Sequence, residues 1–354
     1  MIYDAEGIDD SIKNQAHWAE SNDTPTLTLF LENLENRSLR RVKQLGVTGV
    51  SMAGLDTGGL ETWTDQSLKR HIDRASAAGL ELRNVMFNPS SRVRFGEQGR
   101  DEDIEIINQA IRVAGRQGLP VMEYNFYAHR IVEGYRVVPG RGGSGLMEFN
   151  YQRVKDLPPL VGEEEHSLSD MWDNVTYFLK AVIPVAEEAN VRLALHPNDP
   201  PAPVSRGSGQ IMSTLDGWKK FTDIVPSPFN GITFDCGVTK ELGHDPVEVC
   251  RYFGLRDQIN HVHFRNVVSR VPNLDYTEVW IDEGQVDMFA VMSELVRQKY
   301  PRLIYPEHPP ANDADTEFPF DGISAMTYTG FAYTVGYARA MMQAAISTQS
   351  QGEN

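Results

Sequence analysis

The chain has 354 residues, of which 41% are hydrophobic and 23% are charged, a composition typical of globular proteins that bury a sizeable core. Acidic side chains outnumber basic ones, 49 against 33, so the formal net charge is −16. Nucleic-acid binding depends on Lys and Arg neutralising phosphates, and this charge therefore argues against a nucleic-acid partner. With only two cysteines, Cys236 and Cys250, a disulfide framework is excluded.

We expect neither a membrane-spanning nor an export segment. No apolar run reaches the ~18 residues that a membrane span needs. The first ten residues are acidic, unlike a signal peptide. We therefore expect a soluble, cytoplasmic protein that does not associate with membranes.

Short apolar, β-branched runs recur along the chain and are predicted to be strands, at residues 26–31, 47–52, 80–85, 120–126, 191–196, 231–235, 260–265 and 302–306. Most are followed by a segment with helical periodicity, at residues 101–118, 168–189, 215–224, 247–253, 285–299 and 332–345. The strands show little alternation, as expected when both faces of a parallel sheet are buried. Eight alternating units predict an α/β protein with a single (β/α)8 TIM barrel. No G-x-G-x-x-G motif follows the first strand, which disfavours dinucleotide binding.

Two connections are unusually long, one over residues 126–167 after the fourth strand and one over residues 309–330 after the eighth. Loops of this length in a compact domain are usually functional or disordered. Both follow strands and should lie at the catalytic end of the barrel, so we interpret them as lid loops. We expect one domain over residues 1–354, with 346–354 a disordered tail.

The carboxyl ends of the last four predicted strands each carry a possible metal ligand: His196, Asp235, His263 and Glu307. Barrel active sites are assembled from such positions, and rigid strands hold the donors in place before a metal arrives. Two imidazoles and two carboxylates suit Mn²⁺ or Mg²⁺, whereas Zn²⁺ more often recruits sulfur. Taken singly, Asp235 could instead cap the next helix and Glu307 could form a salt bridge. Four consecutive strand ends together favour a metal site.

Other polar residues fall near the same end of the barrel. His261 shares a strand face with His263 but lies deeper, where it is a packing residue or a partner of His263. One of Tyr124 and Asn125 should point into the barrel. Arg206, in a glycine-rich loop, is either an anion clamp or a solvated loop arginine.

Several motifs together resemble the mannonate dehydratase family. They are Tyr124-Asn125-Phe126, the run from Trp172 to Pro201, the strand from His261 to Val267, and Asp282-Glu283-Gly284 followed by Asp287-Met288. The resemblance covers roughly residues 47–345. It implies a xylose-isomerase-like barrel that uses Mn²⁺ to remove water from D-mannonate and give 2-keto-3-deoxy-D-gluconate. It also implies a homo-oligomer.

Carried over position by position, the family's metal histidines fall on His196 and His263, and its metal cysteine falls on Asp235, with Cys236 one place later. The family's metal aspartate and the catalytic histidine after it fall on Glu307 and His308. Its catalytic tyrosine falls on Tyr333, with Tyr328 and Tyr337 left open. The resemblance implies that Tyr333 takes the C2 proton and His308 protonates the departing hydroxyl. The expected substrate-binding residues are Tyr124, Asn125, Asn198, Arg206, Arg265 and Asn266.

Two ligand positions depart from the family pattern. Asp235 and Glu307 look more like the ligands of sugar epimerases and isomerases in the same superfamily. Those enzymes move a proton with a pair of metal-bound glutamates, and His196 stands where the first would be. We therefore favour dehydration, with a metal-dependent sugar or sugar-acid isomerase or epimerase as the alternative. A catalytically silent sugar-acid-binding protein is a further alternative, and an endonuclease IV-like enzyme is disfavoured by the net charge of −16.

Overall fold

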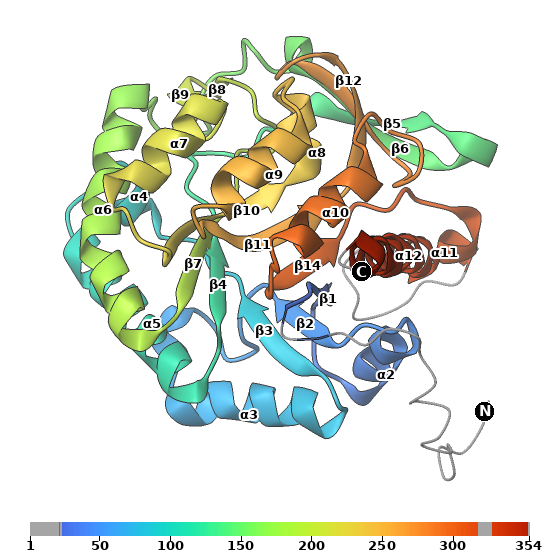
Figure 1. Ribbon diagram of the computed structural model, residues 1–354. Helices are drawn as coiled ribbons and strands as arrows, with labels where there is room; N and C mark the ends of the chain where they lie inside the picture. Colours follow the sequence, from blue (N-terminus) through green and yellow to red (C-terminus); the bar gives the residue numbers. More distant parts are fainter. Residues whose placement is uncertain (1–20, 22, 318–327, 353–354) are drawn as a thin grey trace.

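Eight parallel strands close into a barrel, as Figure 1 shows. The structure is a computed structural model that describes residues 21, 23–317 and 328–352. Neighbouring strands follow the order β1-β14-β11-β10-β7-β4-β3-β2 around the barrel. Their bounds are β1 (Thr26–Leu31), β2 (Gly49–Met52), β3 (Glu81–Val85), β4 (Val121–Tyr124), β7 (Arg192–Leu195), β10 (Asn230–Asp235), β11 (Ile259–Phe264) and β14 (Leu303–Pro306). The predicted fold class and all eight predicted strands are confirmed.

Helices surround the barrel (Figure 1). The longer ones are α2 (Asn36–Gln44), α3 (Asp65–Ala77), α5 (Arg100–Gln117), α6 (Leu168–Ala189), α7 (Leu215–Ile224), α9 (Pro246–Gly254), α10 (Met288–Arg297) and α12 (Tyr328–Gly352). In α6, Met171, Val175 and Phe178 recur three and four residues apart and are buried. The helix begins after Ser167, whose hydroxyl accepts a hydrogen bond from the backbone N–H of Asp170. Within the described ranges, no helix is both long and apolar enough to cross a membrane.

The expectation of a disordered tail is wrong for residues 346–352, which continue α12. The helix contacts α10, and the side-chain amide of Gln349 donates a 2.9 Å hydrogen bond to the carbonyl of Ser293. Met342 and Ala345 are fully buried along the same helix. Packing against α10, rather than the polar composition of the tail, decides the conformation of this segment.

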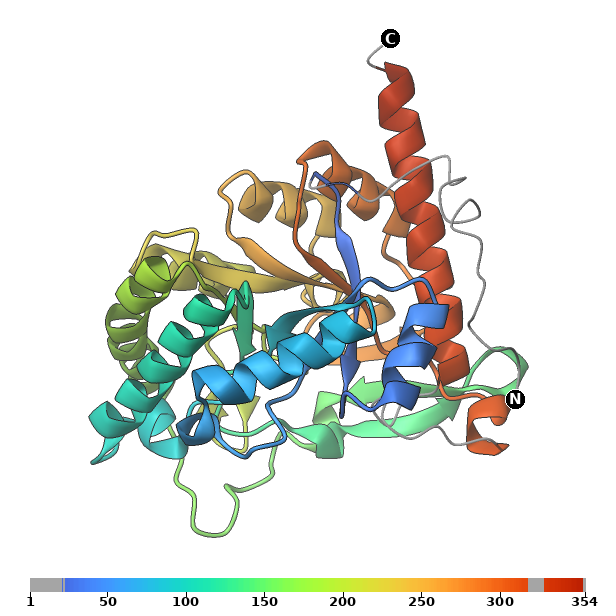
Figure 2. The same ribbon diagram turned by 90° about the horizontal axis from the view of Figure 1, so that it is seen from below.

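The segment 126–167 is not an irregular loop. It contains β5 (Tyr135–Pro139) and β6 (Gly145–Asn150), which form an antiparallel hairpin. The hairpin joins β12 (Asn266–Val271) and β13 (Asp275–Val279) in a four-stranded sheet of order β12-β13-β6-β5. Figure 2 shows this sheet across one end of the barrel. Its partner strands lie more than a hundred residues away in sequence, so no local pattern reveals the pairing.

The sheet continues the barrel at the end where the strands finish, because β12 begins two residues after the end of β11. The second predicted lid, residues 309–330, contains the short helix α11 (Asp313–Glu317) and the first turn of α12. Residues 318–327 of that segment lie outside the described residues. A lid function for either segment stays a prediction.

Candidate active site

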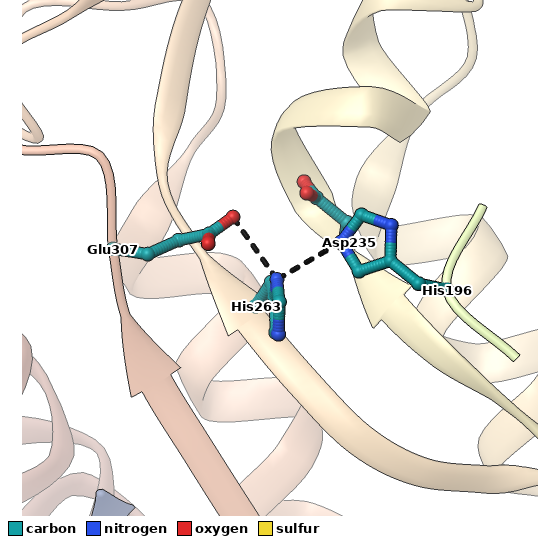
Figure 3. A group of neighbouring side chains, drawn as sticks. All are labelled: His196, Asp235, His263 and Glu307. Atoms are coloured by element: carbon teal, nitrogen blue, oxygen red, sulfur yellow. Dashed lines mark hydrogen bonds and ion pairs between the residues drawn. The ribbon is translucent and has the colours of Figure 1, made fainter. Parts of the chain in front are cut away.

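Four of the predicted site residues converge where the barrel strands end (Figure 3). The possible ligand atoms of His196, Asp235, His263 and Glu307 all lie within 4.8 Å of one another. They lie in or directly after β7, β10, β11 and β14, which are neighbours around the barrel. Asp235 and His263 are paired in the register of adjacent parallel strands, so the sheet itself brings these two side chains together.

The two histidines face each other with nitrogen atoms suited to a cation. Nδ1 of His196 lies 2.7 Å from the carbonyl oxygen of Pro197, so we assign the ring proton to Nδ1. Its Nε2 then carries a lone pair and lies 3.1 Å from Nδ1 of His263. Nδ1 of His263 also lies 3.1 Å from Oε1 of Glu307. That buried oxygen receives no well-aligned hydrogen bond from the described residues. Lone pairs that converge on one point are what a divalent cation requires.

The protonation states of His196 and Glu307 also suit a cation. At His263, Glu307 and Glu123 outweigh burial and raise the pKa well above its usual value, so this ring must release a proton when it binds an ion. Burial, together with nearby His263, lowers the pKa of His196 to about 4, which leaves its imidazole neutral at physiological pH. Burial alone would raise the pKa of Glu307, but His263 and His308 hold it well below the usual value. Burial raises the pKa of Asp235 to about 6, against the opposing effect of Arg265. A neutral imidazole and a carboxylate are the forms that bind metal ions.

Asp235, not Cys236, belongs to this group. The thiol of Cys236 donates to the backbone carbonyl of Arg265 at 3.2 Å, and burial raises its pKa, so the thiolate form is disfavoured. Oδ1 of Asp235 accepts a 2.8 Å hydrogen bond from the backbone N–H of Val238 and caps the short helix α8 (Cys236–Glu241). The capping role considered for Asp235 is therefore real, and the same carboxylate faces His263.

Arg265 is not available to a substrate, contrary to our expectation. Only 1% of the residue is exposed. Its guanidinium nitrogens contact Asp235 at 3.0 Å and Glu241 at 2.8 Å, and further carboxylates surround it, namely Asp199, Glu278 and Glu307. Arg265 thus offsets negative charge behind the four converging residues.

A cavity of about 250 Å³ opens over His196, His263 and Glu307, while Asp235 is fully buried behind them. Its lining includes His196, His263, Glu307, His308 and Asn125 from the predicted set. It also includes residues that sequence reasoning missed, among them Tyr127, Arg130 and Tyr305. Tyr127 and Arg130 lie two and five positions after Asn125, so their place in the connection after a barrel strand was the available signal.

His308 lies at the edge of the cavity in a conformation that few residues adopt. Its φ is +48°, in the left-handed region, where non-glycine residues are uncommon and often functional. Nδ1 lies 2.8 Å from Oε2 of Glu278 in β13, and Nε2 lies 3.5 Å from Oε2 of Glu307. Burial would lower the pKa of His308, but the two glutamates outweigh burial and raise it to about 9. His308 is therefore protonated at neutral pH.

Four other predicted substrate-binding residues lie elsewhere. Tyr124 stacks on Phe87 and packs against Phe178 of α6, so Asn125 is the member of the pair that reaches the cavity. The remaining three bind the protein itself. Asn198 accepts a hydrogen bond from the backbone of Met212, Asn266 donates to the carbonyl of Ile281, and Arg206 pairs with Glu133 at 2.6 Å. These side chains hold loops in place.

The structure does not support Tyr333 as a catalytic residue. It is 41% exposed and contacts the ring of Trp280 edge-on, with the Arg141 guanidinium 5.5 Å from its ring centre. The hydroxyl of Tyr328 donates to the carbonyl of Arg41 at 3.2 Å, and Tyr337 packs against the hydrophobic core. None of these three tyrosines is among the described residues that line the cavity.

Comparisons with known proteins identify the family of the chain. The model of the D-mannonate dehydratase (UxuA) family matches residues 26–162 and 160–351. The mannonate dehydratase of Thermotoga petrophila is 29% identical over 320 residues, which cover 78% of this chain and 86% of that protein. The mannonate dehydratase of Streptococcus equi subsp. zooepidemicus is 29% identical over 300 residues, covering 77% and 82%.

Solved structures show the same fold. The crystal structure of mannonate dehydratase from Streptococcus suis serotype 2 superposes with a TM-score of 0.79 and 24% identity, covering 92% of this chain and 96% of that one. The structure of an L-ribulose 3-epimerase is more distant, with a TM-score of 0.60, 13% identity and coverage of 94% and 99%. The family match spans nearly all of the described residues, and the resemblance found in the sequence is confirmed: the chain belongs to the D-mannonate dehydratase family.

Proposed function

We propose that this protein is a metal-dependent hydro-lyase that dehydrates a sugar acid, D-mannonate being the substrate, to give 2-keto-3-deoxy-D-gluconate. The observation that carries the proposal is the convergence of His196, Asp235, His263 and Glu307 under a cavity in a chain that belongs to the D-mannonate dehydratase family. A small-molecule substrate also fits the size of the cavity, about 250 Å³.

The four converging residues would hold the metal ion. Two imidazole nitrogens and two carboxylates favour Mn²⁺, with Mg²⁺ or another divalent ion as a substitute. When bound, the ion would offset the negative charge of the substrate carboxylate and make the neighbouring C2 proton more acidic. The protein contributes the donors, already in place at four strand ends, and the charge balance from Arg265.

His308 is the group best suited to protonate the departing hydroxyl. It lines the cavity, stands beside Glu307, and is held by Glu278. A pKa of about 9 means that His308 enters the reaction with a proton to give. The same value disfavours His308 as the base of a resting enzyme at neutral pH.

Arg130 takes the substrate-anchoring role that we expected of Arg206. It lines the cavity, and two of its nitrogens bind Asp199: Nε donates to the backbone carbonyl at 2.8 Å and Nη2 lies 3.1 Å from the carboxylate. These contacts fix the planar guanidinium, so an anionic or polyhydroxylated substrate meets a preorganised donor.

Epimerisation or isomerisation is the second candidate. The carboxylates at positions 235 and 307, Asp235 and Glu307, resemble the metal ligands expected in sugar epimerases. The fold likeness to L-ribulose 3-epimerase is weaker than that to mannonate dehydratase, with TM-scores of 0.60 and 0.79. A homo-oligomer, also implied by the resemblance, stays a prediction.

We expect purified protein supplied with Mn²⁺ to convert D-mannonate into a 3-deoxy-2-keto acid. The products are identified by proton NMR in D₂O. Other hexonates and pentonates in the same assay establish specificity. Exchange of deuterium at C2 or an epimer, without loss of water, would support the isomerase candidate. If the protein binds the ion tightly but converts none of the acids, the alternative of a catalytically silent sugar-acid-binding protein is supported.

Replacing Asp235 with Asn should weaken Mn²⁺ binding by at least about 100-fold. Substituting residues that only hydrogen-bond to metal ligands lowers metal affinity by about 10–100-fold, and the loss of a direct ligand should cost at least as much. Asn is also a good helix cap, so α8 should keep its start. The matched control is Cys236→Ser, which should bind Mn²⁺ like the unmodified protein in calorimetric titrations. Lost binding in Cys236→Ser with retained binding in Asp235→Asn would make the thiol the ligand.

His308→Asn should lower kcat for dehydration by about 10²–10⁴-fold, the usual contribution of a positioned acid. Asn tolerates the left-handed backbone that His308 adopts, so the local fold should survive. Tyr333→Phe should leave kcat near that of the unmodified enzyme, because Tyr333 is not among the described residues that line the cavity. Steady-state rates of both variants decide between the two residues, and the reverse pattern would restore the role first expected of Tyr333.

Arg130→Gln should raise KM for the sugar acid by about 10–100-fold, the value of a hydrogen bond to a charged group. Arg206→Gln is the control, since Arg206 binds Glu133 and the carbonyl of Pro158. We expect its KM to stay unchanged. Equal effects of the two substitutions on KM, with both variants folded by circular dichroism, would contradict the assignment of Arg130.

A further inference from the structure

A second cavity, of about 190 Å³, lies at the opposite end of the barrel from the candidate active site. Its lining includes three arginines, Arg83, Arg192 and Arg302, from residues at or next to the starts of β3, β7 and β14. The barrel strands are parallel, so their starts share one end and the four converging residues lie at the other.

An apolar layer closes the inner side of this cavity. Val121, Ala194 and Leu303 are buried and pack together, and two of them, Val121 and Leu303, line the cavity. Two residues further along β4, the side chain of Glu123 is fully buried and faces the histidines of β11. The two cavities have no lining residue in common among those that the structure describes. A ligand at the starts of the strands would therefore occupy a site separate from the candidate active site.

Arg83 carries a donor that lacks an acceptor. Its Nη2 donates a 3.2 Å hydrogen bond to the hydroxyl of Thr26, and its Nη1 lies 3.1 Å from the carboxylate of Glu81. Nε of Arg83 is buried and has no hydrogen-bond partner in the described part of the chain. A buried donor without a partner is unfavourable, so the position favours a ligand that supplies an acceptor.

Arg192 and Arg302 share one carboxylate, that of Asp257. Nη2 of Arg192 lies 2.6 Å from Oδ2, and Nη2 of Arg302 contacts Oδ1. The other acceptor of Arg302 within the described ranges is the backbone carbonyl of Ile259, at 3.0 Å from Nη1. A guanidinium has five N–H donors, so Arg302 keeps donors beyond those that the protein uses.

Positive charge is in excess around this cavity. Among the described residues, the three guanidinium groups pair with two carboxylates, those of Glu81 and Asp257, whose side chains are 67% and 52% exposed. Burial lowers the pKa of Arg192, and the charge of Arg302 adds to this effect, although Asp257 opposes it. The excess is opposite in sign to the net charge of the chain, −16. An anion in the cavity would offset it.

We propose that this cavity is a binding site for a small phosphate-bearing anion. Arginine pairs with phosphate through two parallel hydrogen bonds, and arginines from three strands surround the space. A phosphate group carries about −1.5 to −2 charges at neutral pH and three strong acceptor oxygens. A carboxylate offers a single charge and two oxygens and so matches three guanidinium groups less well. The site depends neither on the metal ion nor on the proposed reaction.

The test is a calorimetric titration of the metal-free protein with inorganic phosphate in about 0.15 M NaCl, where exposed charges are largely screened. We expect saturable binding of one phosphate per chain and weaker binding of acetate. Glycerol 3-phosphate is the second phosphate probe. Tighter binding of this ester than of inorganic phosphate would identify a phosphate monoester as the ligand, and equal or weaker binding would identify free phosphate. Absence of saturable binding of both probes, or equal binding of acetate, would overturn the inference.

Two substitutions at the cavity should change phosphate affinity in opposite directions. Arg83→Gln removes one guanidinium and should weaken phosphate binding about 10- to 100-fold. Asp257→Asn removes a competing negative charge and should tighten phosphate binding about 2- to 5-fold. Asn tolerates the left-handed backbone of Asp257, where φ is +54°, so the local fold should survive.

The matched control is Arg130→Gln, which removes an arginine from the other cavity. It should bind phosphate like the unmodified protein. Loss of phosphate binding in Arg130→Gln, with binding retained in Arg83→Gln, would place the anion in the candidate active site and overturn the inference.

A merely structural role of the arginines predicts a different result. Arg83→Gln and Asp257→Asn would then lower Tm by the same amount with and without phosphate, and phosphate affinity would not change. Our inference predicts that phosphate raises Tm of the unmodified protein, because a ligand that binds only the folded state stabilises it, and that Arg83→Gln loses this rise. If Arg83→Gln does not fold, Arg83→Lys keeps the charge without the fork of donors, and unchanged phosphate affinity in that variant would equally overturn the inference.

Discussion

The mouth of this barrel depends on the balance of buried charge. Five carboxylates surround the single guanidinium of Arg265: Asp199, Asp235, Glu241, Glu278 and Glu307. Isolated buried charges are strongly unfavourable, and one arginine offsets only part of this negative charge. Burial raises the pKa of Glu241 well above its usual value, and His308 and His263 gain protons beside the glutamates. A divalent cation at the four converging residues would add positive charge beside Asp235 and Glu307.

The fold brings these charges together by adding a sheet to the barrel. Arg265 stands between β11 and β12, so one residue links the barrel strand that carries His263 to the four-stranded sheet. β13 of that sheet contributes Glu278, which holds His308, and Tyr276, whose hydroxyl donates to Asp199 at 3.1 Å. Arg130 reaches the same Asp199 from the segment between β4 and β5. The β12–β13 pair therefore holds His308 and Asp199 in place from outside the barrel, while residues in and after the barrel strands line the cavity.

Much of this was predictable from the sequence, and the failures share a cause. The eight strands and the approach of His196, Asp235, His263 and Glu307 follow from apolar runs and strand ends, which are local patterns. The failures depend on contacts between residues that are not neighbours in sequence. They are the sheet pairing within residues 126–167, the burial of Arg265, and the hydrogen bonds of Asn198 and Asn266 to the backbone. The glycine-rich loop around Arg206 made an anion-binding role a reasonable prediction, but Arg206 forms an ion pair with Glu133. Glu123, fully buried on β4 beside His261 and His263, was hidden because a buried acid in an apolar strand has no local signature.

The two departures from the family's ligand pattern also find a physical reason here. A cysteine at position 235 would have to face the guanidinium of Arg265 and the backbone N–H of Val238, both of which favour a hard carboxylate oxygen over sulfur. Asp235 satisfies both groups and still faces His263. At position 307, a glutamate reaches toward His263, His308 and Arg265, and these three cationic partners hold its pKa low. The two carboxylates that we propose as ligands are thus matched to the arginine behind them, so Asp235, Glu307 and Arg265 should be substituted together rather than singly.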